Sequence, residues 1–308
     1  MAKKDLLSIY DLSAKEIKAL INKAFELKSK KKRLNDFAGK TLGLIFEKPS
    51  TRTMVSFAAA MVQLGGAPIL LNAQNLQRKR GESIHDTAKA LSGYLDGLMI
   101  RAFRHSDVEE FAKYSSIPVI NGLTDYEHPC QILADIMTIM ELHKVKSIEA
   151  LEKVKIVFIG DSNNVANSML AVSAVLGLDF TLITPKEYSP EKSILDKALK
   201  FTPSTGAEII ITSDINVAKN ADVIYTDVWT SMGAEAEEKK RKKAFALYQV
   251  NSELLKKASS KCIVLHCLPA LRGEEIAPEI MDKYEHSIFT QAENRLHAQK
   301  AVLLYLMK

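Results

Sequence analysis

The chain has 308 residues, of which 47% are hydrophobic and 26% are charged, and its formal net charge is +5. This composition is close to that of an average soluble globular protein, which excludes a disordered chain, a collagen-like chain and a disulfide-rich scaffold. At about 100–200 residues per domain, we expect one large domain or two of medium size. The net charge is too dilute over this length to indicate a nucleic acid as a partner.

Membrane and export signals are not expected. No stretch of the sequence approaches the ~20 consecutive apolar residues that a membrane helix requires, so we expect no membrane partner. The first residues resemble neither a secretory signal nor a transit peptide. Cys130, Cys262 and Cys267 are odd in number and form no Cys-x-x-Cys pair, so we expect neither a disulfide framework nor a zinc ribbon. A reducing, cytoplasmic location is therefore predicted.

The first predicted helix covers residues 13–30, where Ser13 and Glu16 form a capping box ahead of apolar residues at helical spacing. We interpret its lysine-rich end, and the similar run Glu237–Lys243, as solvated helix surface rather than as a nucleic-acid site. Short apolar runs then alternate with helical segments. The strand candidates are Thr41–Phe46, Ala67–Leu71, Gly97–Ile100, Val119–Asn121, Lys155–Gly160, Phe180–Thr184, Glu208–Thr212, Asp222–Asp227 and Cys262–His266.

Most of these runs are continuously apolar, which is typical of strands buried on both faces of a parallel sheet. The sequence therefore predicts an α/β protein of two domains, each a parallel-type sheet flanked by helices. A long helix over His128–His143 interrupts the alternation, and a polar segment precedes the second series of strands. We place the first domain at residues 1–143 and the second at 144–291, and we expect a terminal helix over 292–308 to pack back on the first.

The segment from Lys48 to Thr53 follows a predicted strand and opens a helix. Ser50, Thr51 and Thr53 supply three hydroxyls and Arg52 a guanidinium, where the first N–H groups of the helix lack partners. Helix capping by one hydroxyl would not account for three hydroxyls and an arginine. We therefore predict an anion site here.

His128 and Gln131 flank a second predicted helix start, with Pro129 in the first turn. These two side chains could polarise a carbonyl group, or His128 could be a structural residue.

In the second half of the chain, three polar segments each follow a predicted strand: Gly160–Asn164, Asp227–Gly233 and His266–Pro269. The carboxyl ends of strands are where open α/β sheets bind ligands, so these segments predict a second site. Trp229, the single tryptophan, is either a core residue or the anchor of a lid.

Cofactor and metal signatures are missing from the sequence. Gly160 is alone where a dinucleotide fingerprint needs three glycines, which disfavours a nicotinamide-dependent dehydrogenase. There is no Walker A sequence and no His-Glu-x-x-His motif. Histidines, cysteines and carboxylates do not fall at the spacing of structural metal sites. We expect no metal and no cofactor.

Four motifs in order now indicate a family: Ser-Thr-Arg-Thr at 50–53, His-Pro-x-Gln at 128–131, Asp-x-x-x-Ser-Met-Gly at 227–233 and His-Cys-Leu-Pro at 266–269. The chain resembles the ornithine carbamoyltransferases, from about Leu6 to its carboxyl terminus and including Glu293–His297. In that family, the first two motifs are shared with aspartate carbamoyltransferases and concern carbamoyl phosphate. The last two point to ornithine.

This resemblance implies transfer of the carbamoyl group from carbamoyl phosphate to the δ-amine of L-ornithine, giving L-citrulline and phosphate. The reaction serves arginine biosynthesis or, in reverse, arginine catabolism. The resemblance also implies an active site in the cleft between the two domains and a homotrimer, or a multiple of trimers, with Gln77 reaching the site of the neighbouring subunit. No cofactor takes part.

The family's binding roles fall on named residues of this sequence. The resemblance assigns to carbamoyl phosphate Ser50, Thr51, Arg52, Thr53, Gln77, Arg101, His128, Gln131, Cys267, Leu268 and Arg295. It assigns to ornithine Asn164, Asp227, Ser231 and Met232. The catalytic residues would be Arg101, His128, Cys267 and Asp227. Arg101, His128 and Thr53 would form an oxyanion hole for the carbonyl oxygen, and the Asp227–Cys267 pair would bind ornithine in a reactive protonation state.

The sequence departs from the family pattern at Met54, Ala58, Cys130 and Leu271, and at Gln291, where the family usually has Glu. Met54 and Ala58 replace a common Arg and Glu four residues apart on one helix, which favours compensated drift over lost activity. Two alternatives stay open: a carbamoyltransferase for another amine, such as putrescine or aspartate, and a non-catalytic relative that binds small molecules.

Overall fold

The computed structural model describes residues 3–30, 34–73, 76–231, 233 and 235–308. The chain divides into two compact units: unit 1 runs to Ala134 and includes Asn294–Lys308, and unit 2 is Asp135–Glu293. The expected boundary near residue 144 differs from this division, because the chain passes between the units inside helices rather than in a polar linker. These helices are α5 (Pro129–Leu142) and α12 (Glu285–Leu306).

Unit 1 contains a parallel sheet of order β2-β1-β3-β4. Its strands are β1 (Thr41–Phe46), β2 (Ala67–Asn72), β3 (Gly97–Arg101) and β4 (Val119–Leu123). Its helices, apart from its parts of α5 and α12, are η1 (Ile9–Asp11), α1 (Ala14–Ser29), α2 (Thr51–Gln63), η3 (Gln77–Arg80), α3 (Ile84–Ser92) and α4 (His105–Tyr114). Ser13 and Glu16 form the predicted capping box at the start of α1.

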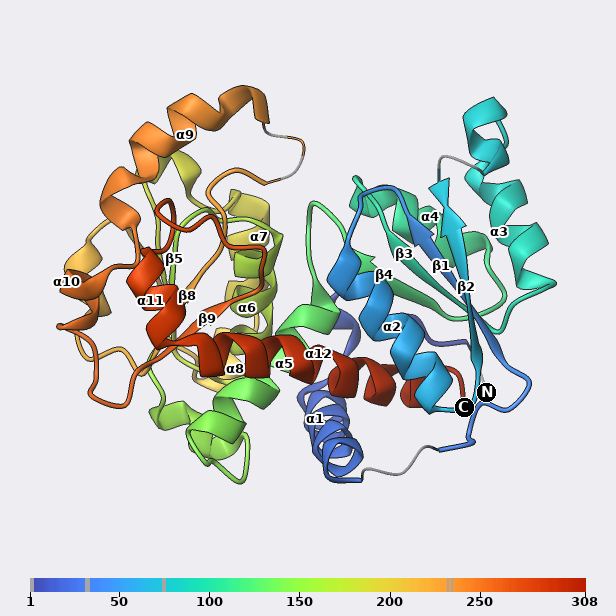
Figure 1. Ribbon diagram of the computed structural model, residues 1–308, viewed down its shortest axis with the longest axis horizontal. Helices are drawn as coiled ribbons and strands as arrows, with labels where there is room; N and C mark the ends of the chain where they lie inside the picture. The colour runs from blue at the N-terminus through green and yellow to red at the C-terminus, as the bar shows by residue number, and fades with distance from the viewer. Residues whose placement is uncertain (1–2, 31–33, 74–75, 232, 234) are drawn as a thin grey trace. The chain divides into compact units, whose positions relative to one another are not determined.

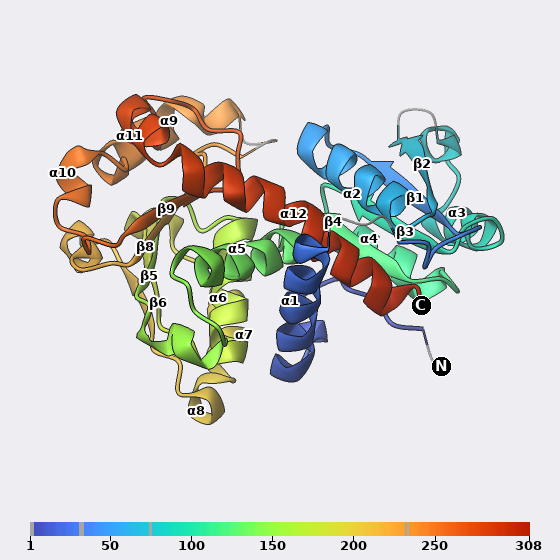
Figure 2. The ribbon, with the colours of Figure 1, turned by 60° about the horizontal axis from the view of Figure 1, so that its bottom comes forward.

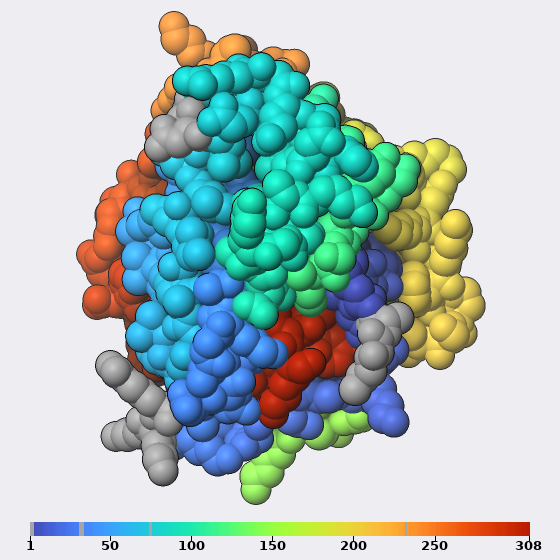
Figure 3. All heavy atoms as spheres, turned by 90° about the vertical axis from the view of Figure 1, so that its right-hand side faces the viewer, coloured from blue at the N-terminus to red at the C-terminus, as the bar shows by residue number. Residues whose placement is uncertain are grey.

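Helices cover both faces of this sheet (Figure 1). Ile45 and Ile100 of the sheet pack in one apolar cluster with α3 and α4, to which α4 contributes the fully buried Phe111. The other face carries α2 and the end of α12, where the backbone oxygen of Met307 accepts a hydrogen bond from Lys40. Figure 3 shows the red end of the chain enclosed by blue segments from its beginning. Unit 1 is thus completed by the last residues of the chain.

Unit 2 contains a parallel sheet of order β7-β6-β5-β8-β9. Its strands are β5 (Ile156–Ile159), β6 (Phe180–Ile183), β7 (Ile209–Thr212), β8 (Val223–Thr226) and β9 (Ile263–His266). Its helices, apart from its parts of α5 and α12, are η4 (Glu149–Lys153), α6 (Asn164–Leu176), η5 (Lys186–Tyr188), α7 (Lys192–Leu199), α8 (Thr202–Thr205), η6 (Ile215–Ala218), η7 (Glu235–Glu237), α9 (Glu238–Phe245), η8 (Ala246–Tyr248), α10 (Ser252–Leu255) and α11 (Pro278–Lys283).

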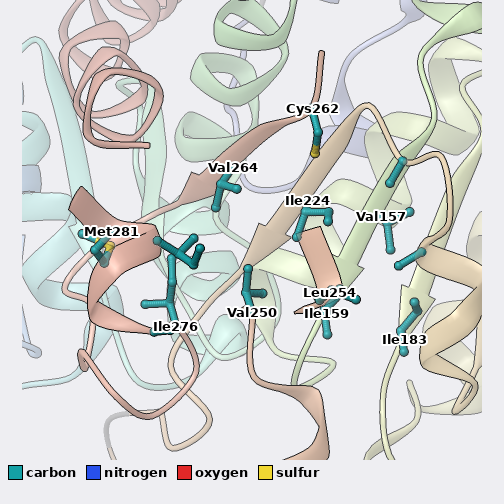
Figure 4. Packing of buried hydrophobic residues seen from close by; sticks show 14 of the residues in the cluster. Val157, Ile159, Ile183, Ile224, Val250, Leu254, Cys262, Val264, Ile276 and Met281 are labelled. Atoms are coloured by element: carbon teal, nitrogen blue, oxygen red, sulfur yellow. The ribbon is translucent and has the colours of Figure 1, made fainter. Parts of the chain in front are cut away.

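Strands β5, β6 and β8 of unit 2 are buried along their whole length, with successive side chains on opposite faces of the sheet, whereas the edge strand β7 is only partly buried. Val157, Ile224 and Val264 pack with α10 and α11 in the core drawn in Figure 4. The alternate residues Phe158 and Tyr225 lie in ring contact on the opposite face. Figure 2 shows α6 and α7 together on one side of this sheet. Continuous apolar runs therefore predict these strands correctly.

All nine predicted strands are present, which confirms the two-domain α/β fold. Two details differ from expectation. β2 lies at the edge of its sheet, and Ile69 and Leu70 stay exposed in the single chain although they are apolar. The terminal helix begins at Glu285 rather than at 292. Ser287 lies within its first turn, and its hydroxyl donates hydrogen bonds to the backbone oxygens of Val264 and Tyr284.

In each sheet the strand order reverses at a point that exposes the carboxyl ends of two neighbouring strands. These strands are β1 and β3 in unit 1 and β5 and β8 in unit 2. Ligands of open α/β sheets bind at such points, and three of the predicted polar segments, Lys48–Thr53, Gly160–Asn164 and Asp227–Gly233, follow β1, β5 and β8. Among the described residues, no helix has the length and apolar character needed to cross a membrane.

Two glycines that end helices of unit 2 provide a test of its packing. Gly177 ends α6 at φ +77° and Gly206 ends α8 at φ +81°. An added Cβ at Gly177 would lie 2.6 Å from the backbone oxygen of Thr205, whereas one at Gly206 would meet no atom within 4 Å. We expect Gly206→Ala to lose about 1–2 kcal/mol of unfolding free energy through its left-handed backbone, and Gly177→Ala to lose more. Urea unfolding measures both, and equal losses would contradict the packing.

Candidate active site

Five buried polar side chains of unit 1 form an arginine–histidine cluster: Thr53, Arg101, His128, Gln131 and Arg295. They come from the start of α2, the end of β3, the start of α5 and its preceding loop, and α12. Arg295 donates from Nη1 to Gln131 Oε1 (2.6 Å) and from Nη2 to Thr53 Oγ1 (3.0 Å). The fold thus brings together residues that are up to 242 positions apart in the sequence.

The hydroxyls at the start of α2 have different surroundings. Ser50 is the N-cap, and its side chain accepts a hydrogen bond from the backbone N–H of Thr53, so capping explains this hydroxyl. The Thr53 hydroxyl is buried against Arg295, whereas Thr51 is exposed and Arg52 is partly exposed. The positive end of the α2 dipole therefore coincides with arginine side chains, which favours an anion.

His128 is buried, and the charges of Arg101 and Arg295 act on it. Burial lowers the pKa of His128 well below 6.5, and the charges of Arg295 and Arg101 lower it further. The imidazole is therefore neutral at physiological pH and can donate a hydrogen bond without adding a third positive charge.

Gln77 and Leu268 lie outside the described contacts of the arginine–histidine cluster. Gln77 opens η3 with an exposed side chain. Leu268 belongs to unit 2, as does Cys267, to which the resemblance also assigns a role toward carbamoyl phosphate. The cleft that we expect between the domains stays a prediction.

A second cluster, the aspartate–cysteine cluster, is formed in unit 2 by Asn163, Asp227 and Cys267. They follow β5, β8 and β9, three neighbouring strands of the sheet. Asp227 Oδ1 accepts hydrogen bonds from Cys267 Sγ (3.0 Å) and from the backbone N–H of Val228 (2.8 Å), and its Oδ2 accepts one from Asn163 Nδ2 (2.7 Å). The carboxylate is thus held in one orientation, with both oxygens engaged.

Only some of the residues expected to bind ornithine lie in the aspartate–cysteine cluster. Asp227 occupies the centre of the aspartate–cysteine cluster, but its amide partner is Asn163 rather than Asn164. Asn163 also caps α6, accepting from the N–H groups of Val165 and Ala166, while Asn164 is the first residue of that helix. Ser231 is partly exposed, and Met232 falls outside the described residues.

Sequence reasoning missed an ion pair beside this cluster. Arg241 of α9 donates from Nη1 to Asp161 Oδ2 (2.8 Å) and to the backbone oxygen of Trp229 (2.9 Å). Its side chain is only 14% exposed, so the interpretation of Glu237–Lys243 as solvated surface is wrong for this residue. Desolvation by burial raises the pKa of Asp161, and the charge of Arg241 opposes that rise. Only the position of Asp161, directly after a strand, could have indicated its role.

Aromatic side chains support the same loop. Trp229 is buried and stacks on Phe245 with their ring centroids 6.0 Å apart. Phe245 also contacts Tyr188, over whose ring the Arg241 guanidinium lies at 4.8 Å. Of the two interpretations of Trp229, the structure favours a core residue.

The loop that carries Cys267 is fixed by a buried histidine and glutamate. His266 Nε2 lies 2.9 Å from Glu275 Oε1, and His266 Nδ1 accepts the backbone N–H of Leu268. Leu268 has φ +60°, a left-handed conformation that costs a non-glycine residue about 1–3 kcal/mol. Asp227, His266 and Cys267 place atoms of metal-binding types within 4.8 Å of one another. Because both ring nitrogens of His266 already have protein partners, we do not assign a metal to them.

The comparison with known families decides the identity of the chain. The carbamoyl-P binding domain of aspartate/ornithine carbamoyltransferase matches residues 4–141, and the Asp/Orn binding domain matches residues 152–306. The chain belongs to the aspartate/ornithine carbamoyltransferase family. The arginine–histidine cluster draws all but Arg295 from the first match, and the aspartate–cysteine cluster lies in the second.

Relatives in this carbamoyltransferase family match over their whole length. The chain is 52% identical to the ornithine carbamoyltransferase of Methanosarcina acetivorans over 310 aligned residues, which cover 99% of this chain and 100% of the relative. It is 53% identical to that of Bacillus anthracis, covering 99% and 95%.

Solved structures agree. The anabolic ornithine carbamoyltransferase of Campylobacter jejuni superposes with a TM-score of 0.93 at 40% identity, covering 98% of each chain. The ornithine carbamoyltransferase of Pyrococcus furiosus superposes with a TM-score of 0.91 at 46% identity, covering 99% of this chain and 97% of that one.

The buried neutral His128 predicts how stability changes with pH. Its folded pKa lies below that of the unfolded chain, so only the unfolded state takes up a proton as the pH falls below 6.5. His128 therefore removes up to about 1.4 kcal/mol of unfolding free energy per pH unit in that range. We expect His128→Gln to flatten the decline between about pH 7.5 and about pH 5.5, measured by urea unfolding at several pH values. Parallel declines in the two proteins would contradict a neutral His128.

Proposed function

We propose that this chain transfers the carbamoyl group of carbamoyl phosphate to the δ-amine of L-ornithine, giving L-citrulline and phosphate. The observation that carries this proposal is identity of about 52% to ornithine carbamoyltransferases over the whole chain. The two clusters support it, because one suits an anion and the other suits a cationic amino acid. The reaction belongs to arginine biosynthesis or, in reverse, to arginine catabolism.

The arginine–histidine cluster would bind carbamoyl phosphate. The start of α2, with Ser50, Thr51 and Arg52, would take the phosphate, whose departure is favoured by positive charge and by the helix dipole. Arg101, Thr53 and the neutral His128 would donate to the carbonyl oxygen, on which negative charge grows as the tetrahedral intermediate forms.

Two hydrogen bonds of Arg295 support the placement of this oxyanion hole. By binding Gln131 and Thr53, Arg295 fixes both side chains before substrate arrives. Gln131 would contact the carbamoyl amide. Preorganised donors need no rearrangement in the transition state, and removing one such donor commonly costs about 10²–10³ in turnover.

The aspartate–cysteine cluster would bind ornithine. The Asp227 carboxylate would face the α-ammonium group, and Asn164 and Ser231 would complete the subsite together with Met232. The δ-amine must lose a proton before it attacks, since an alkyl ammonium has a pKa of ~10.4. We assign to the Asp227–Cys267 pair the binding of ornithine in this reactive state. Cys267 and Leu268 would also border the carbamoyl group.

An amine panel tests the reaction directly. Purified protein is mixed with carbamoyl phosphate and, separately, with ornithine, putrescine or aspartate, and the ureido product and released phosphate are measured. We expect citrulline from ornithine and no product from the other two amines, because putrescine has no α-ammonium or α-carboxylate for Asp227 and its neighbours. Product from putrescine or aspartate would support the alternative carbamoyltransferases, and no product with any amine would support a non-catalytic binding protein.

We further propose a homotrimer, or a multiple of trimers, in the cytoplasm. An apolar surface on unit 1 supports self-association: Val55 and Val62 are seven residues apart on α2, and Leu70 lies on the edge strand β2. Exposed apolar patches commonly mark protein interfaces. Gln77 is exposed a few residues after β2, where a neighbouring subunit's site could receive it. All three cysteines are free thiols, which suits a reducing compartment.

Substituting the apolar surface tests the trimer. Leu70 is 55% exposed, and Leu70→Glu would place a charge in the proposed interface. We expect sedimentation to show a trimer for the wild type and smaller species for the variant, with lower activity because Gln77 no longer reaches a neighbour. Leu247, which is 86% exposed on unit 2, provides the matched control Leu247→Glu. A monomeric wild type, or an unchanged mass for Leu70→Glu, would refute this interface.

A further inference from the structure

The carboxylate of Asp135 is fully buried near the aspartate–cysteine cluster and is not one of the proposed substrate ligands. Asp135 of α5 is 0% exposed. Its Oδ2 accepts a hydrogen bond from the hydroxyl of Tyr225 (2.9 Å), and its Oδ1 accepts one from Gln291 Nε2 (2.7 Å). Gln291 Oε1 in turn accepts the backbone N–H of His266 (2.9 Å). All four residues belong to unit 2.

This network ends on the two strands that carry the reactive pair. Tyr225 is two residues before Asp227 at the end of β8, and His266 is the last residue of β9, directly before Cys267. The register of the sheet pairs Tyr225 with Leu265 and Thr226 with His266. Gln291 therefore holds the backbone from which Cys267 projects, and Asp135 holds both Gln291 and the strand that leads to Asp227.

We propose that Asp135 and Gln291 are positioning residues that keep Cys267 Sγ within hydrogen-bond distance of Asp227. This inference rests on the proposed carbamoyl transfer to ornithine, since it concerns the same reactive pair. Neither residue touches the substrate. They act through the His266 backbone and through Tyr225.

The chemistry of an amide explains why a glutamine suits this position. Its Nε2 donates to the Asp135 carboxylate while its Oε1 accepts from His266, so one side chain satisfies two buried groups of opposite character. Burial, followed by the charges of Asp135, Cys267 and Asp227, raises the pKa of Tyr225 well above 10, so Tyr225 stays a donor.

A glutamate at position 291 would make the network depend on pH. Its carboxylate would face Asp135 across the 2.7 Å now spanned by an N–H group, so the pair must share one proton. The other titratable groups facing it are Tyr225 and His266, with Glu275 beyond His266 and the Asp227–Cys267 pair beyond the strand ends. As the pH rises, the shared proton is lost, the two carboxylates repel each other, and the backbone before Cys267 shifts.

The test compares Gln291→Glu with the wild type at several pH values. We expect kcat of the variant to be close to the wild-type value at low pH and to fall up to about tenfold per pH unit above the pKa of the shared proton. The KM for carbamoyl phosphate should change less than kcat, because most of its proposed ligands lie in unit 1 and only Cys267 and Leu268 are next to this network. The second readout is the rate at which iodoacetamide alkylates Cys267, followed on the same pH scale, with Cys267→Ala as the blank.

Two controls separate positioning from general damage. Gln291→Met keeps a side chain of similar length without a titratable group, so its loss of kcat should not vary with pH relative to the wild type. Tyr225→Phe removes one donor to Asp135 without a change of shape, and it tests the same network if Gln291→Glu does not fold. In that variant we expect a lower kcat and an altered rate of Cys267 alkylation.

The outcomes distinguish this proposal from the proposed function. If no protein forms citrulline, the proposed function fails, while the alkylation rates still decide whether the network positions Cys267. If Gln291→Glu follows the wild type in both kcat and alkylation at every pH, or if Tyr225→Phe leaves both unchanged where the first variant does not fold, the positioning role is refuted.

Discussion

Parallel strands of one sheet all end at the same edge, and this constraint produces both candidate clusters. In unit 1, the ends of β1 and β3 deliver the α2 motif and Arg101, and in unit 2 the ends of β5, β8 and β9 deliver Asn163, Asp227 and Cys267. Buried apolar strands fix these positions, because a slip by one residue would turn every core side chain to the opposite face. Polar residues at the strand ends can therefore be placed within hydrogen-bond distance without contributing to the core.

The two clusters differ in the sign of the charge that they contain. The arginine–histidine cluster gathers positive charge in a buried place, where an additional charge is unfavourable, and the neutral state of His128 is a consequence. The aspartate–cysteine cluster contains one carboxylate, Asp227, and Arg241 compensates the charge of the neighbouring Asp161. Each cluster is thus suited to the charge of the substrate that we assign to it.

Much of the fold was predictable from local patterns. Apolar runs such as Lys155–Gly160 place the strands, and the Ser13–Glu16 box places the first helix, because both signals lie within a few residues. The motifs and the family resemblance together identified Thr53, Arg101, His128, Gln131, Asp227, Cys267 and Arg295, which the structure gathers into the two clusters.

What the sequence did not reveal depends on contacts between distant segments. Arg241 lies in a lysine-rich run in which Lys239, Lys240 and Lys243 are exposed, and its contacts with Asp161, Trp229 and Tyr188 distinguish it. Asn163 and Asn164 are adjacent residues of the same type, so the sequence alone does not indicate which of them contacts Asp227. In the structure, Asn163, the N-cap of α6, donates the hydrogen bond to Asp227. The exposure of β2 follows from its place at the sheet edge, which its apolar residues do not encode.

The discontinuous composition of unit 1 has a consequence for the order in which the protein is made. Residues 294–308 complete unit 1, whereas unit 2 is one uninterrupted stretch that ends at Glu293. A ribosome therefore releases every residue of unit 2 before it releases Arg295, which bridges Thr53 and Gln131. The arginine–histidine cluster can therefore assemble only after the whole of unit 2 has been synthesised.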